Sequence, residues 1–73
     1  MEDFFKWHET DGKMWRKLRL PVGPRTAIIY HGRWGAVVKI AKGRGKVTSK
    51  RRFSNLKQAM AAVDKMEDKA NGI

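Results

Sequence analysis

Apolar and basic residues alternate with a period of two from Met14 to Leu20, which is typical of a β-strand. Residues 14–20 show the pattern, with Met14, Arg16, Leu18 and Leu20 on one face and Trp15, Lys17 and Arg19 on the other. The segment from Pro21 to Pro24 ends this first predicted strand, because proline donates no hydrogen bond to a β-ladder and restricts the residue before it.

Three further segments have strand character. Residues 25–31 are rich in the β-branched and aromatic types that suit a pleated surface. Gly32 and Arg33 are predicted to form the two-residue loop of a type II′ hairpin, after which residues 34–41 form the next strand. Residues 47–53 are extended or form a short edge strand, whose lysines and arginines discourage edge-to-edge pairing.

The C-terminal segment has helical periodicity instead. Asn55 precedes Gln58 with the spacing of a capping box, and Asn71 with Gly72 provides a C-cap. The face predicted to be buried carries Leu56, Ala59, Met60, Val63, Met66 and Ala70, and the polar face carries Lys57, Asp64, Lys65, Asp68 and Lys69. These elements predict an α+β fold, in which a three- to four-stranded antiparallel sheet is packed on one face by a C-terminal amphipathic helix.

Charge divides the chain into two parts. Residues 1–12 form an acidic, aromatic N-terminal arm, and residues 13–73 form the basic sheet-plus-helix domain. The aromatic residues of the arm, Phe4, Phe5 and Trp7, either fold back on the sheet or dock on a protein partner. The acidic residues beside them have the wrong sign for contacting phosphate, so a partner of the arm is expected to be a protein.

The excess of positive charge predicts a polyanionic partner. The chain has 73 residues, with 17 Lys and Arg against 7 Asp and Glu, and a formal net charge of +10. Residues 13–53 hold thirteen of these bases and no acid. Charge of one sign at this density disfavours the compact state by self-repulsion, which a bound anion relieves. We therefore expect DNA or RNA as the partner.

Two regions carry the candidate binding residues. Alternation places Trp15, Lys17 and Arg19, together with Lys39, on the sheet face opposite the helix, where cations can contact phosphates and an indole can stack on a base. Trp15 completes the core in the alternative interpretation. The second region is the basic loop and the run after it, which either clamp a nucleic-acid backbone or are simply solvated: Lys42, Arg44, Lys46, Lys50, Arg51 and Arg52.

Catalytic, metal-binding and membrane functions find little support. The chain has no cysteine and two histidines, His8 and His31, so no nucleophile with its base, and no metal site, can be named. We expect no enzyme activity, no cofactor and no small-molecule substrate. Apolar runs stay far below the roughly 18 residues that span a bilayer, so we expect no membrane association and a cytoplasmic location.

Residues 32–40 and 53–59 resemble the three-stranded-sheet-plus-helix DNA-binding domains of the AP2 family and of integrase arm-binding domains. The resemblance rests on the segment from Gly32 to Ile40, which contains Trp34 and Gly35, and on the segment from Phe53 to Ala59. It implies that the sheet enters the major groove of duplex DNA. The matching residues in this chain are Arg33, Trp34 and Lys39.

The chain is also similar, by type rather than by motif, to small phage-encoded regulators that bind bacterial RNA polymerase. That likeness implies a host-cell location and an alternative function, in which the basic surface and the arm contact a protein and modulate transcription. A ribosome- or RNA-associated role rests on charge alone. RNA-recognition-motif and cold-shock folds fit less well, because the chain lacks a first helix between early strands and lacks their aromatic ladders.

Overall fold

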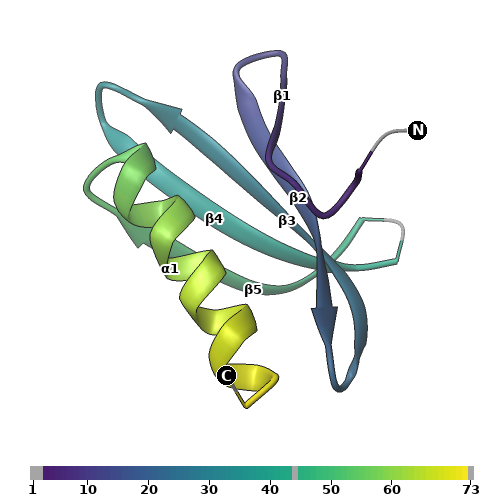
Figure 1. Ribbon diagram of the computed structural model, residues 1–73. Coiled ribbons are helices and arrows are strands. Elements are labelled where there is room, and N and C mark those ends of the chain that lie inside the picture. Colours follow the sequence, from purple (N-terminus) through teal and green to yellow (C-terminus); the bar gives the residue numbers. More distant parts are fainter. Residues whose placement is uncertain (1–2, 44, 73) are drawn as a thin grey trace.

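The computed structural model describes residues 3–43 and 45–72, which form a five-stranded antiparallel sheet and one helix (Figure 1). The fold class is α+β, as predicted, and the strands lie in the sheet in chain order. Their bounds are β1 His8–Thr10, β2 Lys13–Leu20, β3 Gly23–Gly32, β4 Gly35–Lys42 and β5 Lys46–Phe53, and helix α1 spans Leu56–Ala70. In the described residues no helix has the length and apolar character needed to cross a membrane.

Strand β1 was not predicted, and the expected count of three to four strands was therefore slightly too low. It pairs with β2, so that His8 lies opposite Trp15 and Thr10 lies opposite Lys13. Asp11 and Gly12 connect the two strands with φ angles of 51° and 75°. Positive φ at both central residues is typical of the type I′ turn, whose twist matches that of the strands it joins.

The hairpin between β3 and β4 also differs from its prediction. Gly32 pairs with Gly35, so the two loop residues are Arg33 and Trp34 rather than Gly32 and Arg33. The positive φ of this hairpin falls on Gly35, at 121°. A Cβ atom there would lie 2.7 Å from the carbonyl oxygen of Phe53. Gly35 is thus required both by its backbone conformation and by the close approach of the chain that leads into α1.

The core lies between α1 and one face of the sheet. Leu18 and Ile29 are fully buried large side chains of β2 and β3, and Ala59 and Val63 are the buried residues of α1. The buried core cluster consists of Leu18, Ala27, Ile29, Ala36, Val38, Ile40, Ala59 and Val63, and Ala41 is buried as well. Buried and less buried residues therefore alternate along most of β2, β3 and β4, whereas β5 is exposed except at Phe53.

Helix α1 begins and ends where its caps were predicted. The Asn55 side chain accepts a hydrogen bond of 2.9 Å from the backbone N–H of Gln58, which satisfies one free donor of the first turn. At the other end the backbone N–H of Asn71 donates to the carbonyl of Glu67, and Gly72 has a φ of 76°. A glycine in the left-handed conformation commonly follows the last helical turn.

The buried stripe of α1 was predicted wrongly in its second half. Met66 is 38% exposed and Ala70 is also exposed, whereas Glu67 faces the sheet. Glu67 and Asp64 both pair with the guanidinium of Arg16, at 2.5 Å, so Asp64 does not belong to a purely solvated face. Arg16 is a charged residue with only 9% exposure on β2, and its two carboxylate partners explain why polar residues occupy the inner face of the helix there.

Candidate nucleic-acid interface

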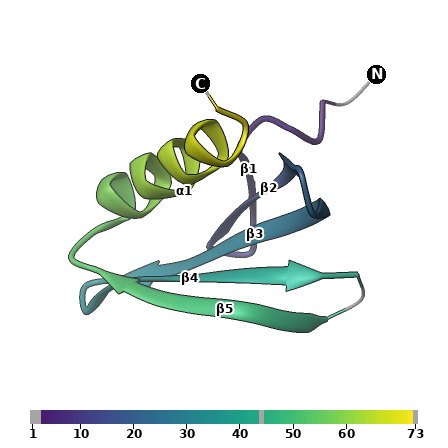
Figure 2. The same ribbon diagram turned by 90° about the horizontal axis from the view of Figure 1, so that it is seen from below.

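Helix α1 covers only one face of the sheet, and Figure 2 shows that no other element of the described chain covers the opposite side of β3, β4 and β5. We call this opposite side the open face. In β2 the side chains of Arg16 and Leu18 are buried beneath α1, so alternation places Trp15 and Lys17 on the open face. Trp15 therefore does not complete the core.

Strand register arranges the open face into rows of directly opposed residues. One row crosses all five strands through His8, Trp15, Ile28, Lys39 and Lys50. The next row crosses them through Thr10, Lys13, Tyr30, Val37 and Arg52. Opposed side chains share a face, so the predicted residues Trp15, Lys39, Lys50 and Arg52 lie on one surface although they come from three different strands.

Positive charges on the open face lie close to one another and to aromatic rings. Lys39 lies directly opposite Lys50 in the sheet. Two like charges at opposed positions lower the stability of the free protein. The Nζ atoms of Lys13 and Lys39 lie 5.1 Å and 4.9 Å from the centroid of the Tyr30 ring. Glu9, the one acid within a described strand, alternates away from the open face, so the strand positions of this face carry bases without acids.

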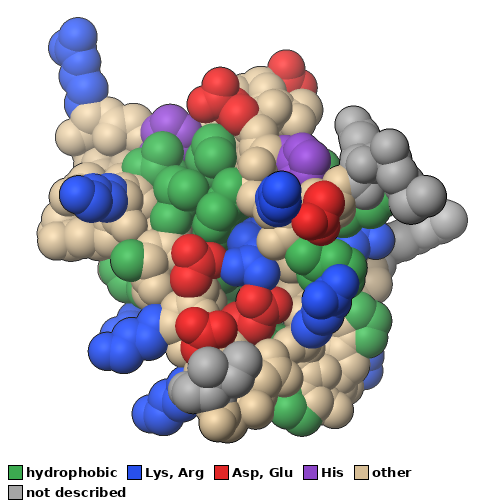
Figure 3. Space-filling model, in the orientation of Figure 1, with side chains coloured by type: hydrophobic (Ala, Val, Ile, Leu, Met, Phe, Trp, Pro, Cys, Tyr) green, Lys and Arg blue, Asp and Glu red, His purple; other side chains and the backbone are tan. Residues whose placement is uncertain are grey.

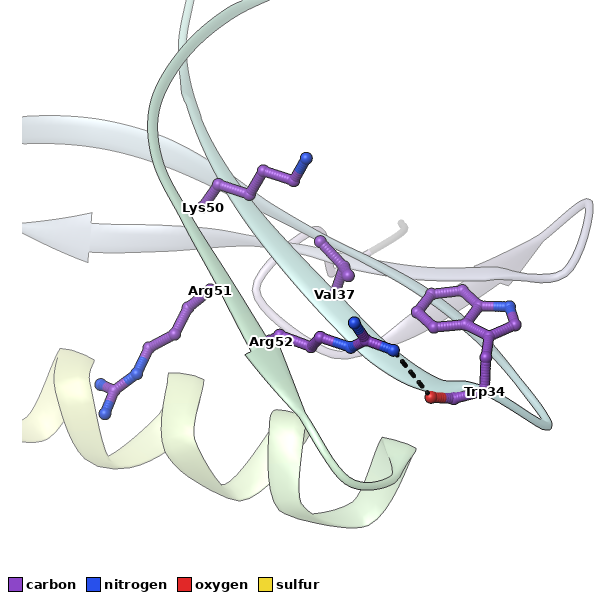
Figure 4. Close-up of a pocket in the computed structure, with 5 residues that line it drawn as sticks. All are labelled: Trp34, Val37, Lys50, Arg51 and Arg52. Atoms are coloured by element: carbon purple, nitrogen blue, oxygen red, sulfur yellow. Dashed lines mark hydrogen bonds between the residues drawn. The ribbon is translucent and has the colours of Figure 1, made fainter.

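Trp34 lies at the edge of the open face. Its side chain rests over Gly32, where an added Cβ atom would lie 2.7 Å from the indole Nε1. It is 53% exposed and lines a shallow hollow of about 480 Å³ together with Val37, Lys50, Arg51 and Arg52, although the Arg51 side chain points toward α1. Figure 4 shows Arg52 directed toward Trp34, whose carbonyl oxygen accepts a hydrogen bond of 3.4 Å from the guanidinium. An exposed indole and the side chains of Lys50 and Arg52 thus share one hollow, which Arg51 also lines.

The N-terminal arm lies against β2, which corresponds to the first of its two predicted alternatives. The backbone N–H of Lys17 donates to the carbonyl of Phe4 at 2.7 Å. Trp7 packs against the core, and the Arg19 guanidinium lies 3.8 Å from the centroid of the Phe5 ring. These contacts tie the arm to the sheet.

Aromatic residues of the arm and of β1 also stack on Trp15. The His8 ring lies 4.7 Å from the indole at an interplanar angle of 20°, and the Phe4 ring lies 6.1 Å from it at 27°. The arm therefore extends an aromatic surface at one end of the open face.

Several predicted binding residues lie elsewhere. Arg51 alternates to the face that carries α1, as Figure 4 shows, and its guanidinium lies 5.4 Å from the centroid of the Phe53 ring. Arg19 lies on Phe5, as described above, and Arg33 is exposed in the β3–β4 turn. Lys42 and Lys46 oppose each other at the exposed end of the β4–β5 hairpin, and Arg44 lies outside the described residues.

The face that carries α1 has a different electrostatic character. Figure 3 shows acidic and basic side chains side by side on this face, and the ion pairs of Arg16 account for part of that mixture. Within residues 3–43 and 45–72, no group of three or more His, Asp or Glu side chains is arranged to hold a metal ion. At the strand positions that the structure describes, the open face carries bases without acids, whereas the face with α1 carries both.

Sequence reasoning missed three residues of the open face, namely His8, Lys13 and Tyr30. The sequence analysis used Tyr30 only as evidence for a strand. Alternation along residues 25–31 places it on the same face as Thr26 and Ile28. His8 and Lys13 were missed because β1 was not predicted and because the first strand was started at Met14. The position of Tyr30 on the open face could therefore have been predicted from the alternation pattern of β3.

Comparison with models of known protein families, with curated protein sequences and with solved structures finds no match for this chain. Functional assignment thus rests on the chemistry of the open face.

Proposed function

We propose that this protein binds nucleic acid through the open face and acts as a small, non-enzymatic transcription or genome-handling regulator. The observation that carries the proposal is the Lys39–Lys50 pair, two lysines at directly opposed positions of β4 and β5, with Lys13 and Lys39 both beside Tyr30 and no acid among the described strand positions of this face. Such a pair is unfavourable in the free protein and becomes favourable when phosphates lie over it.

The aromatic residues add to this support. Phosphate contacts hold a nucleic acid in place, and rings contact its bases. Tyr30 and Trp15 lie among the lysines of the open face rather than in the core, and Trp34 lies beside Arg52. The resemblance to the AP2 family also selected Trp34 and Lys39.

In the alternative, the basic surface contacts acidic patches of bacterial RNA polymerase, and the aromatic side chains of residues 1–12 provide the apolar anchor. Trp7 packs against the core and Phe5 lies on Arg19, so neither observation favours a docking role for the arm. We therefore give precedence to the nucleic-acid proposal.

The test is a series of binding measurements with short DNA and RNA at increasing salt concentration. Two matched variants remove the same charge, Lys39→Gln with Lys50→Gln on the open face and Lys57→Gln with Lys65→Gln on exposed positions of α1. The open-face variant is expected to bind more weakly and to lower the slope of log K against log salt by about 1.4 to 1.8, the contribution of two phosphate contacts. The α1 variant is expected to bind like the wild type.

Equal losses in both variants would show that net charge, not the open face, determines binding. Absence of nucleic-acid binding, with bacterial RNA polymerase retained on the immobilised protein from a nuclease-treated lysate, would favour the alternative.

A further inference from the structure

Three aromatic residues of the open face lie in successive rows of the sheet, although they belong to different segments: Trp15 to β2, Tyr30 to β3 and Trp34 to the β3–β4 turn. Trp15 lies in the row of Ile28, and Tyr30 occupies the next row. Trp34 rests over Gly32, which is the next residue of β3 on that face. Since side chains on one face of a strand recur every second residue at about 3.4 Å per residue, consecutive rows are roughly 7 Å apart.

This spacing does not match stacked bases. Neighbouring bases of one strand in duplex DNA are about 3.4 Å apart, and their faces are covered by each other. A ring can stack only on a base whose face is free, as in single strands, loops and ends. Rings carried by rows that are about twice the duplex rise apart therefore suit bases that have come apart from one another.

Cations flank the line of rings on both sides. Lys13 and Lys17 lie on the β2 side of Tyr30, and Lys39, Lys50 and Arg52 lie on the β4 and β5 side. A single strand of nucleic acid that follows β3 can place its nucleobases on the rings and its phosphates beside these lysine and arginine side chains. The ammonium groups of Lys13 and Lys39, about 5 Å from the Tyr30 centroid, are close enough to contact the phosphates that flank a base on that ring.

We propose that the open face takes single-stranded nucleic acid, with unpaired bases stacked on Tyr30 and Trp34 beside the His8–Trp15 stack. This inference rests on the proposed function and goes beyond it, because it selects unpaired strands over the duplex that the AP2 resemblance implies. DNA and RNA share the chemistry involved, namely free base faces and phosphates, and the experiment separates them.

The test compares four fluorescently labelled probes of one sequence and about ten nucleotides, a length within the range that small sheet domains cover. They are single-stranded DNA, single-stranded RNA and the two corresponding blunt duplexes. The protein is expected to bind at least one single strand about tenfold or more tightly than either duplex. The better of the two single strands identifies the sugar that the site prefers.

Ring-removing variants then locate the stacking. Tyr30→Leu keeps an apolar side chain without a π-face, and Trp34→Leu changes a residue that is 53% exposed. Each is expected to weaken single-strand binding about fivefold or more while duplex binding stays unchanged. Phe5→Leu, a ring outside the open face, serves as the control and is expected to leave both unchanged.

The outcomes separate the two proposals. Duplex binding equal to or tighter than single-strand binding, or equal losses for duplex and single strand in Trp34→Leu, overturns the inference and leaves the proposed function standing. Failure of all four probes to bind overturns both.

Discussion

Lys39 of β4 and Lys50 of β5 lie directly opposite each other in the sheet, on the face that α1 leaves uncovered. Directly opposed like charges lower the stability of a sheet. Lys39 also lies 4.9 Å from the centroid of the Tyr30 ring, whose other neighbouring cation is Lys13, so this pair is part of the basic and aromatic surface for which we propose a polyanionic partner.

The first prediction concerns the stability of the free protein. Lys50→Gln removes the repulsion with Lys39 and is expected to raise the free energy of unfolding at low salt by about 0.5 kcal/mol. The gain should vanish near 1 M salt, where the Debye length falls to about 3 Å. Urea denaturation at both salt concentrations measures this, with Lys57→Gln on α1 as the control. A gain that is independent of salt would contradict the electrostatic explanation.

Arg16 gives the second prediction. Its guanidinium is nearly buried and holds Asp64 and Glu67 against the sheet, so Arg16→Ala leaves two carboxylates without their partner. We expect a loss of about 3 kcal/mol, the lower end for a broken buried pair because Asp64 is half exposed. Arg33→Ala, which removes an exposed turn arginine, should change stability little. Similar urea midpoints for the two variants would show that the ion pairs do not hold α1 in place.

The third prediction tests the turn that precedes β4. Gly35→Ala combines a φ of 121° with a Cβ atom 2.7 Å from the Phe53 carbonyl oxygen. We expect a loss of about 3 kcal/mol or more from backbone strain and overlap together. Gly12→Ala shares the positive φ but meets nothing within 4 Å, so about 1 kcal/mol is expected there. Thermal denaturation of both variants provides the comparison, and equal losses would exclude the contact with Phe53 as the cause.

The fourth prediction distinguishes a folded arm from a docking peptide. Trp7 packs against the core, so Trp7→Ala is expected to destabilise the domain by about 2 kcal/mol, less than for a fully buried tryptophan. Phe4→Ala removes a ring that is 42% exposed and should cost less than 1 kcal/mol. Hydrogen exchange of the β1 and β2 amides reports the same difference locally. Unchanged stability in Trp7→Ala would mean that the arm contributes nothing to the fold.

The sequence predicted β2 to β5 and α1 to within two residues, because alternation, turn residues and caps all pointed to the same elements. β1 was missed because His8–Thr10 is short and polar, and its pairing depends on β2 rather than on its own propensity. The β3–β4 turn was displaced by one residue because Gly35, not Gly32, carries the positive φ.

The candidate site was predictable where alternation alone decides the face, as for Trp15, Lys17 and Lys39. The candidate site was not predictable where strand pairing decides on which face of the sheet a side chain lies. Arg51 and Arg52 are neighbours in sequence, yet one faces α1 and the other the open face, and only the β4–β5 register settles which.

The most direct test of the open-face account is an NMR titration of the isotope-labelled protein with a short nucleic acid. The account predicts that chemical-shift changes concentrate on the backbone amides of Tyr30, Lys39 and Lys50, while those of Lys57 and Lys65 in α1 stay in place. Saturable binding with changes confined to α1 or to the arm would show that the basic, aromatic face of the sheet is not where this protein meets nucleic acid.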